Sequence, residues 1–65
     1  MKAIIEDLLG DPELRMAVRH AINKRLISIH NDRLVLDSNL MIDVRINKKL
    51  REESEYLIEL LEKYP

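Results

Sequence analysis

The pattern that most constrains the fold lies around Asn31 and Asp32, where apolar and polar residues alternate on both sides of a turn signal. Asn and Asp both tolerate the positive φ values of a two-residue hairpin turn. A hairpin with these two residues at its turn has apolar pairs on one side only. The facing pairs are Ile27 with Leu36 and Ile29 with Leu34. The pattern therefore predicts a β-hairpin with one apolar inner face.

A third alternating run follows the hairpin from Leu40 to Ile46. If residues 38–40 form a short loop, the new strand extends both inner rows of the sheet. These rows are Ile27–Leu36–Ile42 and Ile29–Leu34–Val44. The alternation favours a three-stranded antiparallel meander, or the β-hairpin alone. The open alternative is a 26-residue terminal helix that begins near Ser38.

Helices are predicted on both sides of the sheet. Residues 3–9 form a short apolar helix, with Ile4 among its apolar residues, and Gly10 ends it in the left-handed conformation. Asp11-Pro12 is a strong helix start, which predicts a second helix over residues 12–24. A leucine-rich amphipathic helix spans about 48–63, with Asn47 as its cap. The predicted fold class is α+β, in one small domain over residues 1–65.

A chain of 65 residues without cysteine has a marginal core and no disulfides to reinforce it. A partner chain is the remaining source of stability, so we expect a homodimer or a tight complex with another protein. Part of the interface comes from the outer face of the sheet and part from the last helix. The predicted interface residues are Leu26, Val35, Met41, Leu57, Ile58 and Leu61.

The net charge is only −1, but residues 15–33 carry five cationic side chains against one acid. A helix with Arg, Asn and Lys on one exposed face is able to enter a major groove, where it contacts phosphates and base edges. The predicted DNA contacts are Arg15, Arg19, His20, Asn23 and Lys24, with Arg33 at the hairpin tip. The alternative is an ordinary solvated helix face.

At the hairpin tip, the strand register brings His30, Arg33 and Arg45 together. Such a cluster suits a phosphate or a partner carboxylate. His20 and His30 are too far apart in sequence, and on different elements, for a metal motif. There is no glycine-rich phosphate loop, and no serine has a plausible base within its own predicted element. We therefore expect no metal, no cofactor and no enzymatic activity.

Residues 17–37, AVRHAINKRLISIHNDRLVLD, resemble the recognition helix and wing of winged helix-turn-helix regulators. The shared features are a basic amphipathic helix, a Leu-Ile step into a strand and a short hairpin. The segment MIDVRINKKLREESEYLIELLEKYP separately resembles the strand and first helix of ribbon-helix-helix proteins. Both resemblances imply a dimeric DNA-binding protein.

Two functions follow. The first is a small dimeric transcriptional regulator that binds duplex DNA through the basic helix and the hairpin. The second is a protein–protein interaction adaptor or assembly subunit with no nucleic-acid role. The sequence lacks a signal-peptide pattern and an apolar run of membrane-spanning length, so we expect a cytoplasmic, soluble protein without a membrane partner.

Overall fold

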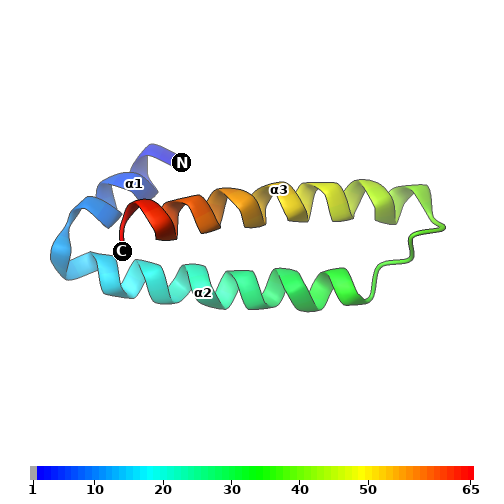
Figure 1. Ribbon diagram of the computed structural model, residues 1–65, viewed down its shortest axis with the longest axis horizontal. Helices are drawn as coiled ribbons and strands as arrows, with labels where there is room; N and C mark the ends of the chain where they lie inside the picture. The colour runs from blue at the N-terminus through cyan, green and yellow to red at the C-terminus, as the bar shows by residue number, and fades with distance from the viewer. Residues whose placement is uncertain (1) are drawn as a thin grey trace.

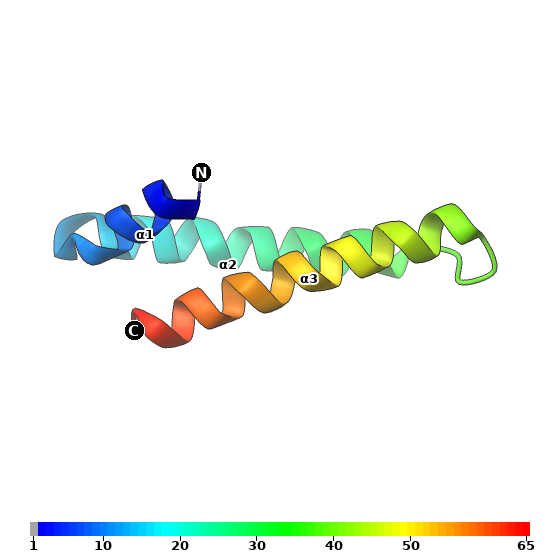
Figure 2. The same cartoon turned by 90° about the horizontal axis from the view of Figure 1, so that it is seen from above.

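Three helices make up the fold (Figure 1). The computed structural model describes the backbone of residues 2–65 and the side chains of residues 5–65. Helix α1 spans Lys2–Gly10, α2 spans Pro12–Leu34 and α3 spans Met41–Lys63. Helices α2 and α3 form a long antiparallel hairpin joined by residues 35–40, and α1 lies at its open end (Figures 1 and 2). The molecule measures 44 × 19 × 17 Å.

The prediction of an α+β fold is wrong, because the described residues contain no strand and no sheet. Asn31 and Asp32 lie within α2, not at a hairpin turn. Ile29 is 1% exposed, whereas Ile27 is 63% exposed, although the hairpin register placed them on the same inner face. Leu34, Ile42 and Val44 are also exposed. The meander and both of its inner rows are therefore absent.

The meander is absent because a helical pattern of inward-facing residues, which extends over both long helices, competes with the short alternation. Inward-facing positions recur every three or four residues along both long helices, as in an antiparallel helix pair. On the α2 side they are Arg15, Arg19, Ile22, Leu26, Ile29, Arg33 and Leu36. On α3 they are Asp43, Asn47, Leu50, Ser54, Leu57, Leu61 and Tyr64. All except Arg33 are buried or half-buried, so the 3.6-residue period decides the fold.

Some of the predicted helix boundaries agree with the structure and others do not. Asp11 caps α2 as expected, with its Oδ1 accepting a hydrogen bond from the Glu13 N–H at 2.9 Å. The short first helix is confirmed, but Gly10 belongs to it and does not have a positive φ. The side chain of Ile4 lies outside the described residues. Helix α2 runs ten residues past the predicted end at Lys24, to Leu34.

Helix α3 begins at Met41, seven residues before the predicted start near Lys48. Its N-cap is Leu40, which makes no side-chain capping bond. The long terminal helix that was kept as an alternative is therefore closer to the structure. Asn47 is not a cap: it lies inside α3 and accepts a hydrogen bond from Arg33.

The core is small and lies toward the open end of the hairpin. Its buried residues are Leu9, Ile22, Ile29, Leu57 and Leu60. Helix α1 contributes Leu9, with Ile5 packed against the cluster. Because α1 covers one side of the hairpin only, Leu60 is 3% exposed whereas Ile58, on the other flank of α3, is 45% exposed. The side without α1 is open along its whole length (Figure 2).

Candidate interaction surfaces

Two of the six predicted DNA-contacting residues hold the open end of the hairpin together. Arg15 donates from Nε to the Leu9 carbonyl at 2.8 Å, and its guanidinium lies 6.0 Å from the centre of the Tyr64 ring. Arg19 donates to the carbonyls of Leu61 at 2.8 Å and Tyr64 at 2.6 Å. These carbonyls belong to the last turn of α3, where a cation also complements the helix dipole.

A third member of the set, Arg33, faces α3 near the loop and donates from Nε to the Asn47 side-chain oxygen at 2.7 Å. The other three, His20, Asn23 and Lys24, are exposed on α2. The six residues therefore do not share one face. The sequence pattern could not separate them, because it did not show that α2 continues past Lys24 and pairs with α3 along its length.

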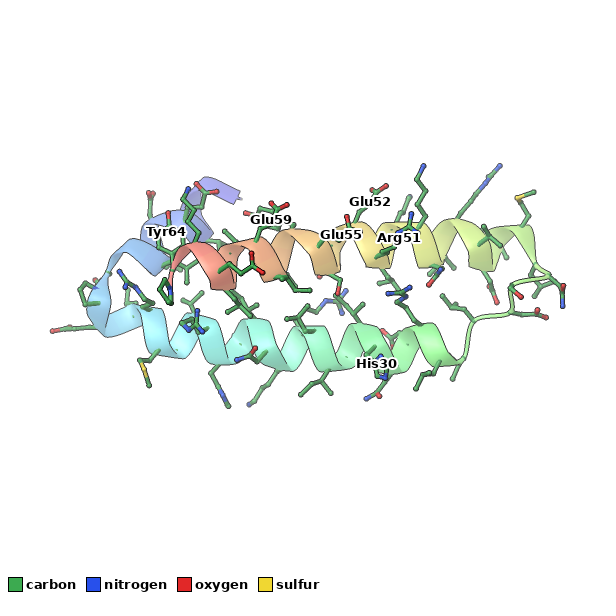
Figure 3. The ribbon with its side chains drawn as sticks, in the orientation of Figure 1. His30, Arg51, Glu52, Glu55, Glu59 and Tyr64 are labelled. Atoms are coloured by element: carbon green, nitrogen blue, oxygen red, sulfur yellow. The ribbon has the colours of Figure 1, made fainter. Side chains whose placement is uncertain are left out.

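The cluster expected from His30, Arg33 and Arg45 depended on the strand register, which does not exist. His30 is exposed on α2 and Arg45 is exposed on α3, while Arg33 is bonded to Asn47. The prediction of an anion site at a hairpin tip is wrong for this reason. Figure 3 shows His30 on α2, the helix opposite to that of the labelled acids.

The predicted interface residues divide into two groups. Leu57 is buried, and Leu26 and Leu61 are half-buried at the contact between α2 and α3. Val35, Met41 and Ile58 are exposed. The first group is therefore the core of the hairpin itself, whereas the second group is available to a partner.

Exposed apolar side chains gather in the loop-end half of the hairpin, defined here as residues 27–46. Eight large apolar residues are exposed there: Ile27, Leu34, Val35, Leu40, Met41, Ile42, Val44 and Ile46. A groove of about 410 Å³ along α3 is lined by Ile42 and Ile46 with cationic side chains around them. A second groove, of about 380 Å³, lies beside the loop and includes Leu36 and Val44. Exposed apolar residues of this kind are candidates for an interaction surface.

One ion pair joins the two long helices near their middle. Arg25 donates to both carboxylate oxygens of Glu53, at 2.6 and 3.0 Å. This hydrogen bond lowers the pKa of Glu53 below its ordinary value, against the opposing effect of partial burial. Sequence analysis missed the pair because it placed Arg25 before a strand and Glu53 in a separate helix.

We expect replacement of Glu53 by glutamine to lower the free energy of unfolding by less than about 1 kcal/mol at neutral pH, because both side chains are well exposed. Because the pKa of Glu53 is lower in the folded state, the ionised carboxylate stabilises the fold at pH values above its unfolded-state pKa of about 4.3. That contribution disappears as the pH falls through the lowered value. Urea unfolding at neutral and at strongly acidic pH should therefore show a difference only at neutral pH. Glu59→Gln, on the same helix, is the control.

No helix in the described part of the chain combines the length and the apolar character needed to cross a membrane. Among the same residues, no group of three or more histidine or acidic side chains is placed to hold a metal ion. The fold and its surfaces define an antiparallel helical hairpin with a short third helix. Comparison with protein-family models, with curated proteins and with solved structures found no match to this chain.

Proposed function

We propose that this chain is a helical assembly module that associates with a second copy of itself through a surface that includes exposed apolar residues of the loop-end half of the hairpin. The observation that supports the proposal is the distribution of apolar side chains. Among the residues whose side chains the structure describes, five apolar ones are buried, and one of these, Ile29, lies in residues 27–46, where eight large apolar residues are exposed. Burial of apolar surface is the main favourable term in association, so this half gains most from a partner.

The limited burial within a single chain also supports self-association. A 65-residue chain buries a smaller fraction of its surface than a longer chain does, and this one has no disulfide to compensate. Two antiparallel helices in contact with each other cover only one stripe of each helix. A second helical hairpin covers further stripes and produces a four-helix bundle, which is a common solution for helices of this length.

The test is the molar mass in solution, measured by size-exclusion chromatography with light scattering over a range of chain concentrations. We expect a mass of twice the 7.7 kDa of one chain. Val44→Glu should shift the mass toward that of one chain, because it places a charge in the apolar patch. Leu14→Glu is the matched control: Leu14 is 43% exposed and Val44 is 45% exposed, but Leu14 lies at the open end.

Circular dichroism of both variants checks that the helices remain folded. A mass of one chain for the unsubstituted protein at millimolar concentration would refute the proposal. Equal effects of the two substitutions would also contradict it. The same chromatography with a generic duplex at low salt tests the alternative of a DNA-binding regulator, whose exposed residues are now His20, Asn23 and Lys24. Those three residues carry one full positive charge, so they give this alternative less support.

A further inference from the structure

A second seam of regularly spaced residues lies on the side of α3 that α1 leaves open. Its members are Met41, Val44, Lys48, Arg51, Glu55, Ile58 and Glu62, three or four residues apart. They are all exposed. The residues that pack α2 against α3 have the same spacing. It places one continuous stripe of a helix against a partner helix. We call these seven residues the outer seam.

Two sets of positions in the outer seam are complementary when the seam is reversed, whereas Met41 then falls opposite Glu62 and Arg51 falls opposite Arg51 of the second copy. Lys48 and Glu55 are equally distant from the midpoint of residues 51 and 52, and Val44 and Ile58 are equally distant from residue 51. A two-fold axis close to residue 51 brings each Lys48 near Glu55 of the second copy and each Val44 near Ile58. Val44 and Ile58 are both 45% exposed, so both retain apolar surface to bury. Every contact then occurs twice, as in an isologous interface.

The charges of the whole helix follow the same symmetry. The first half of α3 carries the cations Arg45, Lys48, Lys49 and Arg51, and the second half carries the acids Glu52, Glu53, Glu55, Glu59 and Glu62. Antiparallel alignment brings opposite charges together, whereas parallel alignment places like charges side by side. Arg51 lies next to the axis. Its Nε is 4.0 Å from Oε1 of Glu55 on the same helix. Figure 3 shows Arg51 and Glu55 on neighbouring turns, with Glu52 and Glu59 directed away from α2.

In the view of Figure 1 the molecule measures 44 × 19 Å, and α3 runs along this side over most of its length. The opposite side is less suitable, because α1 occupies its open end and Arg25 is already paired with Glu53 there. Ile42 and Ile46 remain exposed on that side, and an interface built on them is the competing arrangement.

From the seam and the charge pattern, and resting on the proposed self-association, we infer that the second copy docks antiparallel on the outer seam of α3, which shares Met41 and Val44 with the loop-end half. The basic half of each α3 then lies along the acidic half of the other. The residues of α3 alone then determine both the partner, a second copy of the chain, and its antiparallel orientation.

Engineered cysteines test the orientation, and the chain has no cysteine of its own to interfere. A mixture of Val44→Cys and Ile58→Cys chains should form a mixed disulfide under mild oxidation. Val44→Cys alone should not, because two-fold symmetry about residue 51 separates the two copies of residue 44 by about 20 Å, well beyond disulfide reach. Mass spectrometry distinguishes the mixed product from the homodimers.

Charge reversal tests the seam independently. Lys48→Glu alone and Glu55→Lys alone should each associate about tenfold more weakly, because each places two like-charged pairs in the dimer. A mixture of the two variants restores both opposite-charge pairs and should form a heterodimer of native affinity. Lys24→Glu, a reversal on exposed α2, is the control and should leave association unchanged.

The outcomes separate the inference from the proposed function. A single-chain mass for the unsubstituted protein overturns both. A dimer in which Val44→Cys couples to itself overturns the antiparallel arrangement and leaves self-association intact. A dimer that the cysteine mixture does not trap, and that both charge variants leave unchanged, assigns the interface to the side of Ile42 and Ile46.

Discussion

Replacing Ile29 by alanine is expected to lower the free energy of unfolding by about 3 kcal/mol, which is a large part of the stability of a domain this small. Ile29 is 1% exposed and belongs to the buried core between α2 and α3. The substitution removes its apolar contacts and leaves a cavity that two packed helices fill only in part. Urea unfolding, followed by the helical circular dichroism signal, measures the loss.

Ile27→Ala is the matched control for this experiment, because it makes the same chemical change two residues away. Ile27 is 63% exposed, so its loss should cost less than about 0.5 kcal/mol. Low chain concentration keeps any contribution from association small. A β-hairpin would bury both residues on one face and would give similar losses. Equal effects of the two substitutions would therefore contradict the helical hairpin.

Replacing Arg19 by methionine is expected to lower the free energy of unfolding by about 2 kcal/mol, and the melting temperature by about 10 °C. Arg19 donates to two carbonyls in the last turn of α3, at 2.8 and 2.6 Å. Hydrogen bonds from a charged donor are stronger than neutral ones. Methionine keeps much of the apolar stem but leaves both carbonyls without this donor.

Lys24→Met, on exposed α2, is the control for Arg19 and should leave the melting temperature almost unchanged. Thermal unfolding of both variants, with duplex binding measured in parallel, distinguishes a structural role from a DNA contact. A variant at Arg19 that melts like the unsubstituted chain, but has lost affinity for DNA, would contradict the packing role described here.

The parts of the fold that depend on local chemistry were predictable. The cap at Asp11 followed from the Asp-Pro step, because a side-chain oxygen and a fixed proline φ act within one turn. The apolar stripe around Leu57 and Leu61 was long enough to identify a helix. Residues 26–46 were different, because Ile27, Ile29, Leu34 and Leu36 satisfy a period of two over a short window. Four such residues do not distinguish a strand from a helix.

The candidate surface was predictable only in part. Val35, Met41 and Ile58 were predicted as interface residues and are exposed, and their role at an interface stays a prediction. The outer seam was not visible, because the predicted fold placed Val44 in a strand and Ile58 in a separate helix. Once both lie on one continuous α3, the symmetry of Lys48 and Glu55 can be recognised.

The sequence by itself determined the alternation of apolar residues around Asn31 and Asp32, the helix start at Asp11 and the uneven distribution of charge. These are local properties of neighbouring residues. Only the tertiary structure decided whether this alternation marks a strand, because the conformation of Ile29 and Leu36 depends on what they pack against. Helix α3 supplies that partner, with Leu50 and Leu57 at matching intervals. A helix pair buries Ile29 and leaves Ile27 in solvent, and no reading of residues 26–36 alone shows this.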